Sequence, residues 1–156
     1  MTAQSNHRKI QESQFVTELA IVLGVPENPV YAEKVLCSVF QLISERVPPI
    51  ASSALIAPLP IEVKKLYLKG WNRKFLPKKD FDYEQFIDTL YEFKGSEHFR
   101  LFRSKTQVKD SVAVIFEVIK RHIPIKQYGI MMSLMPLLLR VNLSVDYLFE
   151  GQSYFL

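Results

Sequence analysis

The chain has 156 residues, of which 48% are hydrophobic and 23% charged, values typical of a soluble globular protein with one good core. Its single cysteine excludes an internal disulfide, and its apolar uncharged run at residues 127–139 is shorter than the roughly 20 residues that span a bilayer. The net charge is +4, all of it in residues 1–78, which permits an anionic partner without requiring one.

The first half of the chain shows helical spacing of its apolar residues. Residues 1–10 form a polar leader that we expect to be flexible; it lacks the apolar core of a signal peptide, so a cytoplasmic location is expected. The apolar side chains of Phe15–Leu23 recur on one helical face, and Gly24 then ends that helix. Two further helices are predicted. One runs from about Val30 to Val47 and is stopped by the two prolines that follow, and the other runs from about Ile61 to Lys69.

The second half of the chain repeats this plan. The sequence "VFQLISERVP", Val39 to Pro48, aligns without a gap with "IFEVIKRHIP", Ile115 to Pro124. The first predicted helix has a counterpart at a smaller offset, through the matches of Phe15, Val16 and Leu19 with Phe86, Ile87 and Leu90. Two copies of one helical unit explain the length better than two unrelated domains.

These patterns predict an all-α fold, with two tandem helical repeats packed as one compact helical bundle. The repeats cover about residues 11–71 and 82–149 of a single domain, residues 11–156, and a short basic linker joins them. Aromatic and proline residues at corresponding places are interpreted as structural anchors of the two repeats, namely Phe40, Pro60, Tyr67, Trp71, Phe116 and Pro136.

The acidic stretch "DFDYE" after the linker is interpreted as the start of a helix. Asp82 with Gln85 three residues on has the form of a capping box. The alternation of Asp80, Asp82 and Glu84 also resembles the first ligands of a calcium loop, but the glycine at its sixth position and the glutamate at its twelfth are missing. Helix capping is therefore favoured over calcium binding.

Several of these motifs together resemble a known family. "ERVPP", the pair Leu59-Pro60, "LYLKGW" from Leu66 to Trp71 and "FDYEQFIDTL" are similar to the pattern of the bacterial domain of unknown function 2267. The resemblance runs from about Phe15 to Leu148, and the chain departs from the pattern at Val47, where leucine is expected. It implies an all-helical, internally duplicated domain, and it brings no activity, substrate or catalytic residue.

The sequence offers few residues for catalysis. It has no G-x-S-x-G elbow, no glycine loop that would cradle a phosphate and no H-E-x-x-H pair. Cys37 lies on an apolar helical stripe, and the three histidines, His7, His98 and His122, are far apart in the chain. We expect no catalytic residue, no metal site and no cofactor.

A basic stretch is the strongest candidate for contact with an anionic partner. Seven cations precede Asp80 without an intervening acid, namely Lys64, Lys65, Lys69, Arg73, Lys74, Lys78 and Lys79. Lysines on one side of a helix and in its last turns are also what a solvated helix end requires, and the structural interpretation is favoured. The aromatic residues among the lysines, Tyr67 and Trp71, are interpreted as packing anchors and not as platforms for bases.

The function favoured by the sequence is that of a non-catalytic helical domain, a protein-interaction or adaptor module whose partner is another protein. The alternative is a nucleic-acid-associated protein that binds through the basic segment 64–79. An enzyme with a helical site of unrecognised type stays open at low weight.

Overall fold

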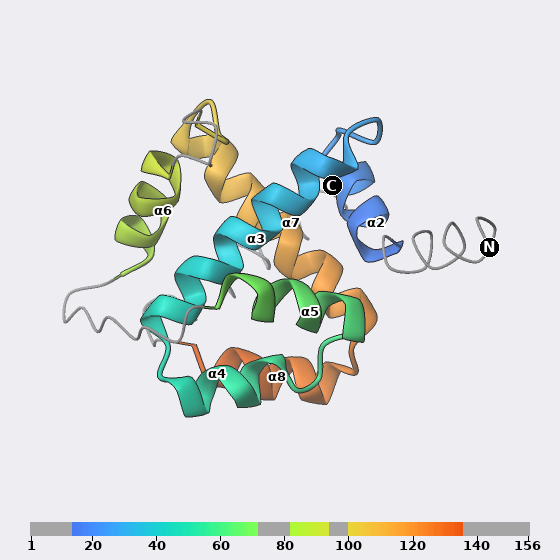
Figure 1. Ribbon diagram of the computed structural model, residues 1–156, viewed down its shortest axis with the longest axis vertical. Coiled ribbons are helices and arrows are strands. Elements are labelled where there is room, and N and C mark those ends of the chain that lie inside the picture. The colour runs from blue at the N-terminus through green and yellow to red at the C-terminus, as the bar shows by residue number, and fades with distance from the viewer. Residues whose placement is uncertain (1–13, 72–81, 94–99, 136–156) are drawn as a thin grey trace, which may run out of the picture.

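The computed structural model describes residues 14–71, 82–93 and 100–135, and every helix or strand assigned within these ranges is an α-helix (Figure 1). The helices are α2 (Gln14–Val22), α3 (Pro29–Arg46), α4 (Pro49–Ile56), α5 (Ile61–Gly70), α6 (Tyr83–Glu92), α7 (Lys105–His122) and α8 (Ile125–Ser133). The prediction of a compact all-α fold is confirmed. Outside the described residues lie the predicted leader, the linker with Arg73, Lys74, Lys78 and Lys79, and the anchor Pro136.

Prolines fix where several helices begin. Val47 is extended because the residue before a proline is pushed out of the helical region, so α3 ends one residue earlier. The sequence analysis used the next two prolines only as a stop signal. In the structure Pro48 is the N-cap of α4 and Pro49 is its first residue, so the same pair also starts a helix that periodicity alone did not reveal. Pro60 and Pro124 hold the same position before α5 and α8.

The two long helices organise the bundle. In Figure 1, α3 and α7 cross near the centre, with α6 to the left of the crossing, α2 to its right, and α4, α5 and α8 below it. Helix α2 contacts both α3 and α7, and α6 likewise contacts both. Helix α5 packs on α3, and α4 lies beside α8. Segments far apart in the sequence are therefore held together by one crossing.

One core joins both halves of the chain. Its fully buried side chains come from α2, α3, α5, α6, α7 and α8, and the largest are Tyr67, Phe15, Phe86, Leu19, Leu36, Ile87, Leu90, Ile115, Ile119 and Met131. Phe40 and Phe116, at corresponding places on α3 and α7, are 2% and 5% exposed. Because these residues belong to a single cluster, the two halves are expected to unfold together.

A buried polar contact between two helices lies within this apolar framework. The hydroxyls of Ser52 and Tyr67 are 2.7 Å apart and buried, which satisfies both groups and ties α4 to α5. Burial raises the pKa of the Tyr67 phenol, and the hydrogen bond to Ser52 opposes part of this rise. The Tyr67 ring also lies between those of Phe40 and Trp71, at centroid distances of 5.2 and 6.0 Å, so it packs as a core residue.

A polar contact also joins the first described helix to α7. Glu18 Oε2 lies 2.5 Å from His122 Nε2, and Glu18 Oε1 lies 3.4 Å from Arg121 Nη1. The His122 ring packs on Phe15 at a centroid distance of 5.2 Å. His122 is the last residue of α7, and the contact holds α2 across the end of that helix.

Truncation of either central phenylalanine should destabilise the whole protein. We expect Phe40→Ala and Phe116→Ala each to lower the free energy of unfolding by about 3–5 kcal/mol, because each leaves a cavity in the shared core. Urea unfolding followed by circular dichroism should show one transition for each variant. Ile125→Ala, at a side chain that is 77% exposed, is the control and should change stability by less than about 0.5 kcal/mol. Two transitions, only one of them shifted by each variant, would contradict a common core.

Candidate functional site

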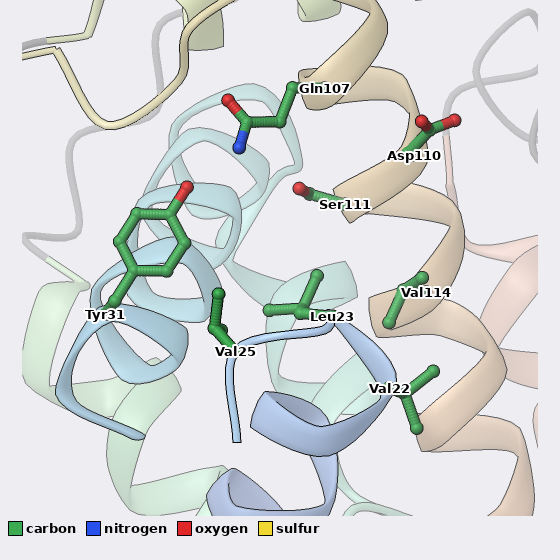
Figure 2. A pocket seen from close by; sticks show the side chains of 8 residues that line it. All are labelled: Val22, Leu23, Val25, Tyr31, Gln107, Asp110, Ser111 and Val114. Carbon is green, nitrogen blue, oxygen red and sulfur yellow. The ribbon is translucent and has the colours of Figure 1, made fainter. Parts of the chain in front are cut away.

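Two adjoining cavities lie where the α2–α3 turn meets the first turns of α3 and α7, and Figure 2 shows the residues that line the first of them. One has a volume of about 320 Å³ and is lined by Val22, Leu23, Val25, Tyr31, Gln107, Asp110, Ser111 and Val114. The other has a volume of about 380 Å³ and is lined by Val25, Asn28, Tyr31, Arg100, Leu101, Arg103 and Gln107. Since Val25, Tyr31 and Gln107 line both, the cavities form one continuous depression, called the α3–α7 groove below.

The turn between α2 and α3 supplies the apolar floor of the groove. Gly24 has φ +83°, a conformation that other residues adopt only with strain, and it allows the chain to reverse directly after the helix. The amide of Val25 donates to the carbonyl of Ala20 (2.9 Å) and that of Gly24 to the carbonyl of Ile21 (3.0 Å). These two bonds are the Schellman arrangement, which satisfies the last carbonyls of α2 and places Val25 in the groove.

The first turn of α3 forms one wall. Asn28 caps the helix through its side chain, which accepts a hydrogen bond from the Tyr31 amide (3.1 Å). The Tyr31 hydroxyl donates to the carbonyl of Leu101 at 2.8 Å, and so ties α3 to the segment that leads into α7. Partial burial raises the pKa of the Tyr31 phenol, and the nearby positive charge of Arg103 opposes that rise.

The first turn of α7 forms the opposite wall. Ser104 Oγ accepts a hydrogen bond from the Gln107 amide (3.1 Å), and Gln107 Oε1 accepts one from the Arg103 amide (2.5 Å). These bonds fix the Gln107 side chain, and Figure 2 shows it facing Tyr31 across the groove. The sequence analysis above names no start for this helix. The S-x-x-Q spacing of Ser104 and Gln107 could have located the helix start, because it is the same signal that Asp82 and Gln85 carry.

The structure confirms the cap at Asp82, whose carboxylate accepts from the Gln85 amide at 2.9 Å. Only this half of the predicted capping box is formed. Gln85 Oε1 is buried and has no hydrogen-bond partner within the described ranges.

Charges around the groove are unevenly paired. The three acids on the exposed side of α6 each form an ion pair with a cation in or just before α7, namely Glu84 with Lys109 (3.3 Å), Asp88 with Lys105 (2.9 Å) and Glu92 with Arg100 (3.2 Å). Arg100 also lies over the Tyr91 ring, 4.8 Å from its centroid. Arg103 and Asp110 have no ion-pair partner in the part of the chain that the structure describes, and they line different cavities of the groove.

This arrangement suits binding. Valine and leucine side chains make an apolar floor, while a phenol, an amide and an arginine offer hydrogen bonds at its rim. Residues 14–71, 82–93 and 100–135 bring together no cluster of three histidine, cysteine or carboxylate side chains that could hold a metal ion. Burial, with Glu33 nearby, raises the pKa of the Cys37 thiol despite the opposing charge of Lys69, so the thiolate that a nucleophilic role needs is disfavoured.

The basic residues singled out in the sequence lie apart from this groove. Lys65 and Lys69 are exposed on α5 and Lys64 is partly exposed there, but α5 contributes no lining residue. Among the predicted anchors, Phe40, Tyr67 and Phe116 are buried, Trp71 is partly buried, and Pro60 precedes α5 as its N-cap. The groove residues were not among the sequence candidates, because the motifs that form it are 70 or more residues apart.

The helices and their shared core place the chain in the all-α class. The family described as "Uncharacterized conserved protein (DUF2267)" matches residues 12–140, and the protein therefore belongs to that family, as its motifs indicated. A comparison with curated proteins found no match. None of the helices within the described ranges is long and apolar enough to cross a membrane.

Loss of the Tyr31 hydroxyl should loosen the segment before α7. We expect Tyr31→Phe to lower the free energy of unfolding by about 0.5–1.5 kcal/mol, the usual contribution of one partly buried hydrogen bond. Amide hydrogen exchange should become faster at Phe102 and Arg103, which adjoin the Leu101 carbonyl. Val30→Ala, at an exposed neighbouring position, is the control. Unchanged stability and exchange in Tyr31→Phe would show that this hydrogen bond is not formed in solution.

Proposed function

We propose that the protein is a non-catalytic binding module that takes a segment of a partner protein into the α3–α7 groove. The observation that carries the proposal is the groove itself, an apolar floor between two helix starts with hydrogen-bonding groups at the rim. Each of its cavities falls in the range of about 300–1,000 Å³ that is common for binding pockets. Grooves between helices commonly bind peptide segments in this way.

Internal duplication is part of this proposal. Helices α3 and α7 both have 18 residues, and α7 begins and ends 76 residues after α3. Helix α2 contacts its own long helix and the other one, and α6 does the same. This pattern of contacts is expected when two copies of one unit pack around an approximate two-fold axis.

The duplication also accounts for the position of the groove. At the offset of 76 residues, the cap Asn28 corresponds to the cap Ser104, and Tyr31 corresponds to Gln107. Tyr31 and Gln107 are the two residues that face each other across the groove (Figure 2). The groove thus lies where the two units meet, a place where the divergence of two equivalent turns can produce a binding site without disturbing either core.

A charge placed on the groove floor should abolish capture of the partner. Val25 is partly buried in the floor, whereas Val30 is 62% exposed on the first turn of α3, so the same substitution can be compared at both. In affinity capture from host lysate after nuclease treatment, we expect wild type and Val30→Glu to retain the same protein and Val25→Glu to lose it. Binding should then be measured by calorimetry with that protein purified.

Circular dichroism and thermal melting should establish that Val25→Glu is still folded. A partner bound equally by Val25→Glu and Val30→Glu would place the interaction elsewhere on the surface. Failure of wild type to retain any protein would also contradict the proposal.

A nucleic-acid-associated role is the second candidate, favoured by the exposed Lys65 and Lys69 on α5. Binding through about four phosphates would give a slope of log K against log salt near −3.6, from about −0.9 per contact. Replacement of Lys74, Lys78 and Lys79 by glutamate should then abolish it, while Lys126→Glu on α8 should not. We expect no measurable duplex binding at physiological salt. Tight, salt-sensitive binding that the triple variant loses would establish this candidate in place of the first.

A further inference from the structure

Arg103 lines the groove and forms no ion pair with any of the described residues. Within the described residues, the neighbouring cations Arg100, Lys105 and Lys109 each have a carboxylate of α6 within 3.3 Å. Glu84, Asp88 and Glu92 of α6 are therefore all paired with other cations, and no described carboxylate lies within ion-pair distance of Arg103.

The position of Arg103 is fixed although its side chain is exposed. Its amide donates to Gln107 Oε1, and the next residue, Ser104, is the cap of α7. Its charge is close enough to the Tyr31 hydroxyl to affect that group electrostatically. The backbone of Arg103 is therefore held at the rim, beside Tyr31 and Gln107, while its guanidinium can turn toward a ligand.

The two ends of the groove differ in charge. Arg103 lines the cavity of about 380 Å³, whereas Asp110 lines the cavity of about 320 Å³. An anionic group would be attracted to the first end and repelled from the second. A guanidinium is also suited to a carboxylate, because its planar fork can donate two parallel hydrogen bonds to the two oxygens.

We propose that the α3–α7 groove recognises an acidic side chain of the partner segment, with its carboxylate on Arg103 and an adjacent apolar side chain on the floor formed by Val22, Leu23, Val25 and Val114. This inference rests on the proposed function and specifies the chemistry of the segment. Arg103 sets the end at which the acid lies, Asp110 excludes a second acid from the other end, and the floor requires the apolar neighbour.

The probe is a blocked dipeptide, acetylated leucyl-aspartate amide, which carries one apolar and one acidic side chain. Its matched control is the leucyl-asparagine form, which keeps the size and removes the charge, and the leucyl-lysine form serves as a second control with the opposite charge. Binding is followed by the ¹H–¹⁵N chemical shifts of Val25, Tyr31 and Gln107 at low salt, where screening is weakest. We expect the aspartate form to bind roughly two- to five-fold more tightly than the asparagine form, the range for a solvent-accessible ion pair.

Variants of the arginine test the role of its charge. Arg103→Gln should remove the preference for aspartate, and Arg103→Glu should transfer it to the lysine form, while Lys126→Gln should leave it unchanged. The substituted side chain is exposed, and the hydrogen bond from the backbone amide of residue 103 to Gln107 Oε1 is retained, so the fold should persist.

Equal binding of the aspartate and asparagine forms, or a preference that survives in Arg103→Gln, would overturn the inference. Absence of groove shifts with the aspartate dipeptide would overturn it as well. None of these results decides whether a partner protein occupies the groove, which the comparison of Val25→Glu with Val30→Glu tests separately.

Discussion

The crossing of α3 and α7 is the constraint on which the rest of the structure depends. Most of the stability of a helix in a protein comes from tertiary packing of its apolar face, so these two helices of 18 residues depend on the burial of theirs. These faces meet the side chains of α2 and α6, which flank the crossing on opposite sides, and those of α5 and α8 below it, in a single core. Every other helix is thereby positioned relative to these two, and so is the groove between their first turns.

The local chemistry of helix ends converts this crossing into a groove. The Schellman bonds around Gly24, the side-chain caps at Asn28 and Ser104, and the contact of Gln107 with the Arg103 amide each satisfy backbone groups that a helix leaves unpaired. The same interactions hold a phenol and an amide face to face above apolar residues. The proposed recognition would therefore use the same turns that stabilise the helix ends, and a ligand would meet side chains that are already in place, which lowers the entropic cost of binding.

Ion pairing leaves a pattern that charge counts do not show. The sequence draws attention to the lysine-rich stretch before Asp80, where seven cations occur in residues 64–79 without an intervening acid. The structure draws attention to a single arginine, because the neighbouring cations are paired with the acids of α6 and Arg103 is not paired with any of them. A cation beside a cavity is more specific for a ligand than several on an open helix, since the cavity adds shape and apolar contact to the charge.

The sequence by itself determined the helical class, the approximate bounds of α2, α3 and α5, the cap at Asp82 and the family, because helical periodicity, caps and motifs are local. It did not reveal α4, since the proline pair before it indicates both an end and a start. Only the tertiary structure decided that Tyr31 reaches Leu101, 70 residues away, and that the α6 acids pair with Arg100, Lys105 and Lys109 and leave Arg103 unpaired among the described residues. Such contacts depend on how helices cross, and crossing is set by the packing of the whole core, which no local spacing encodes.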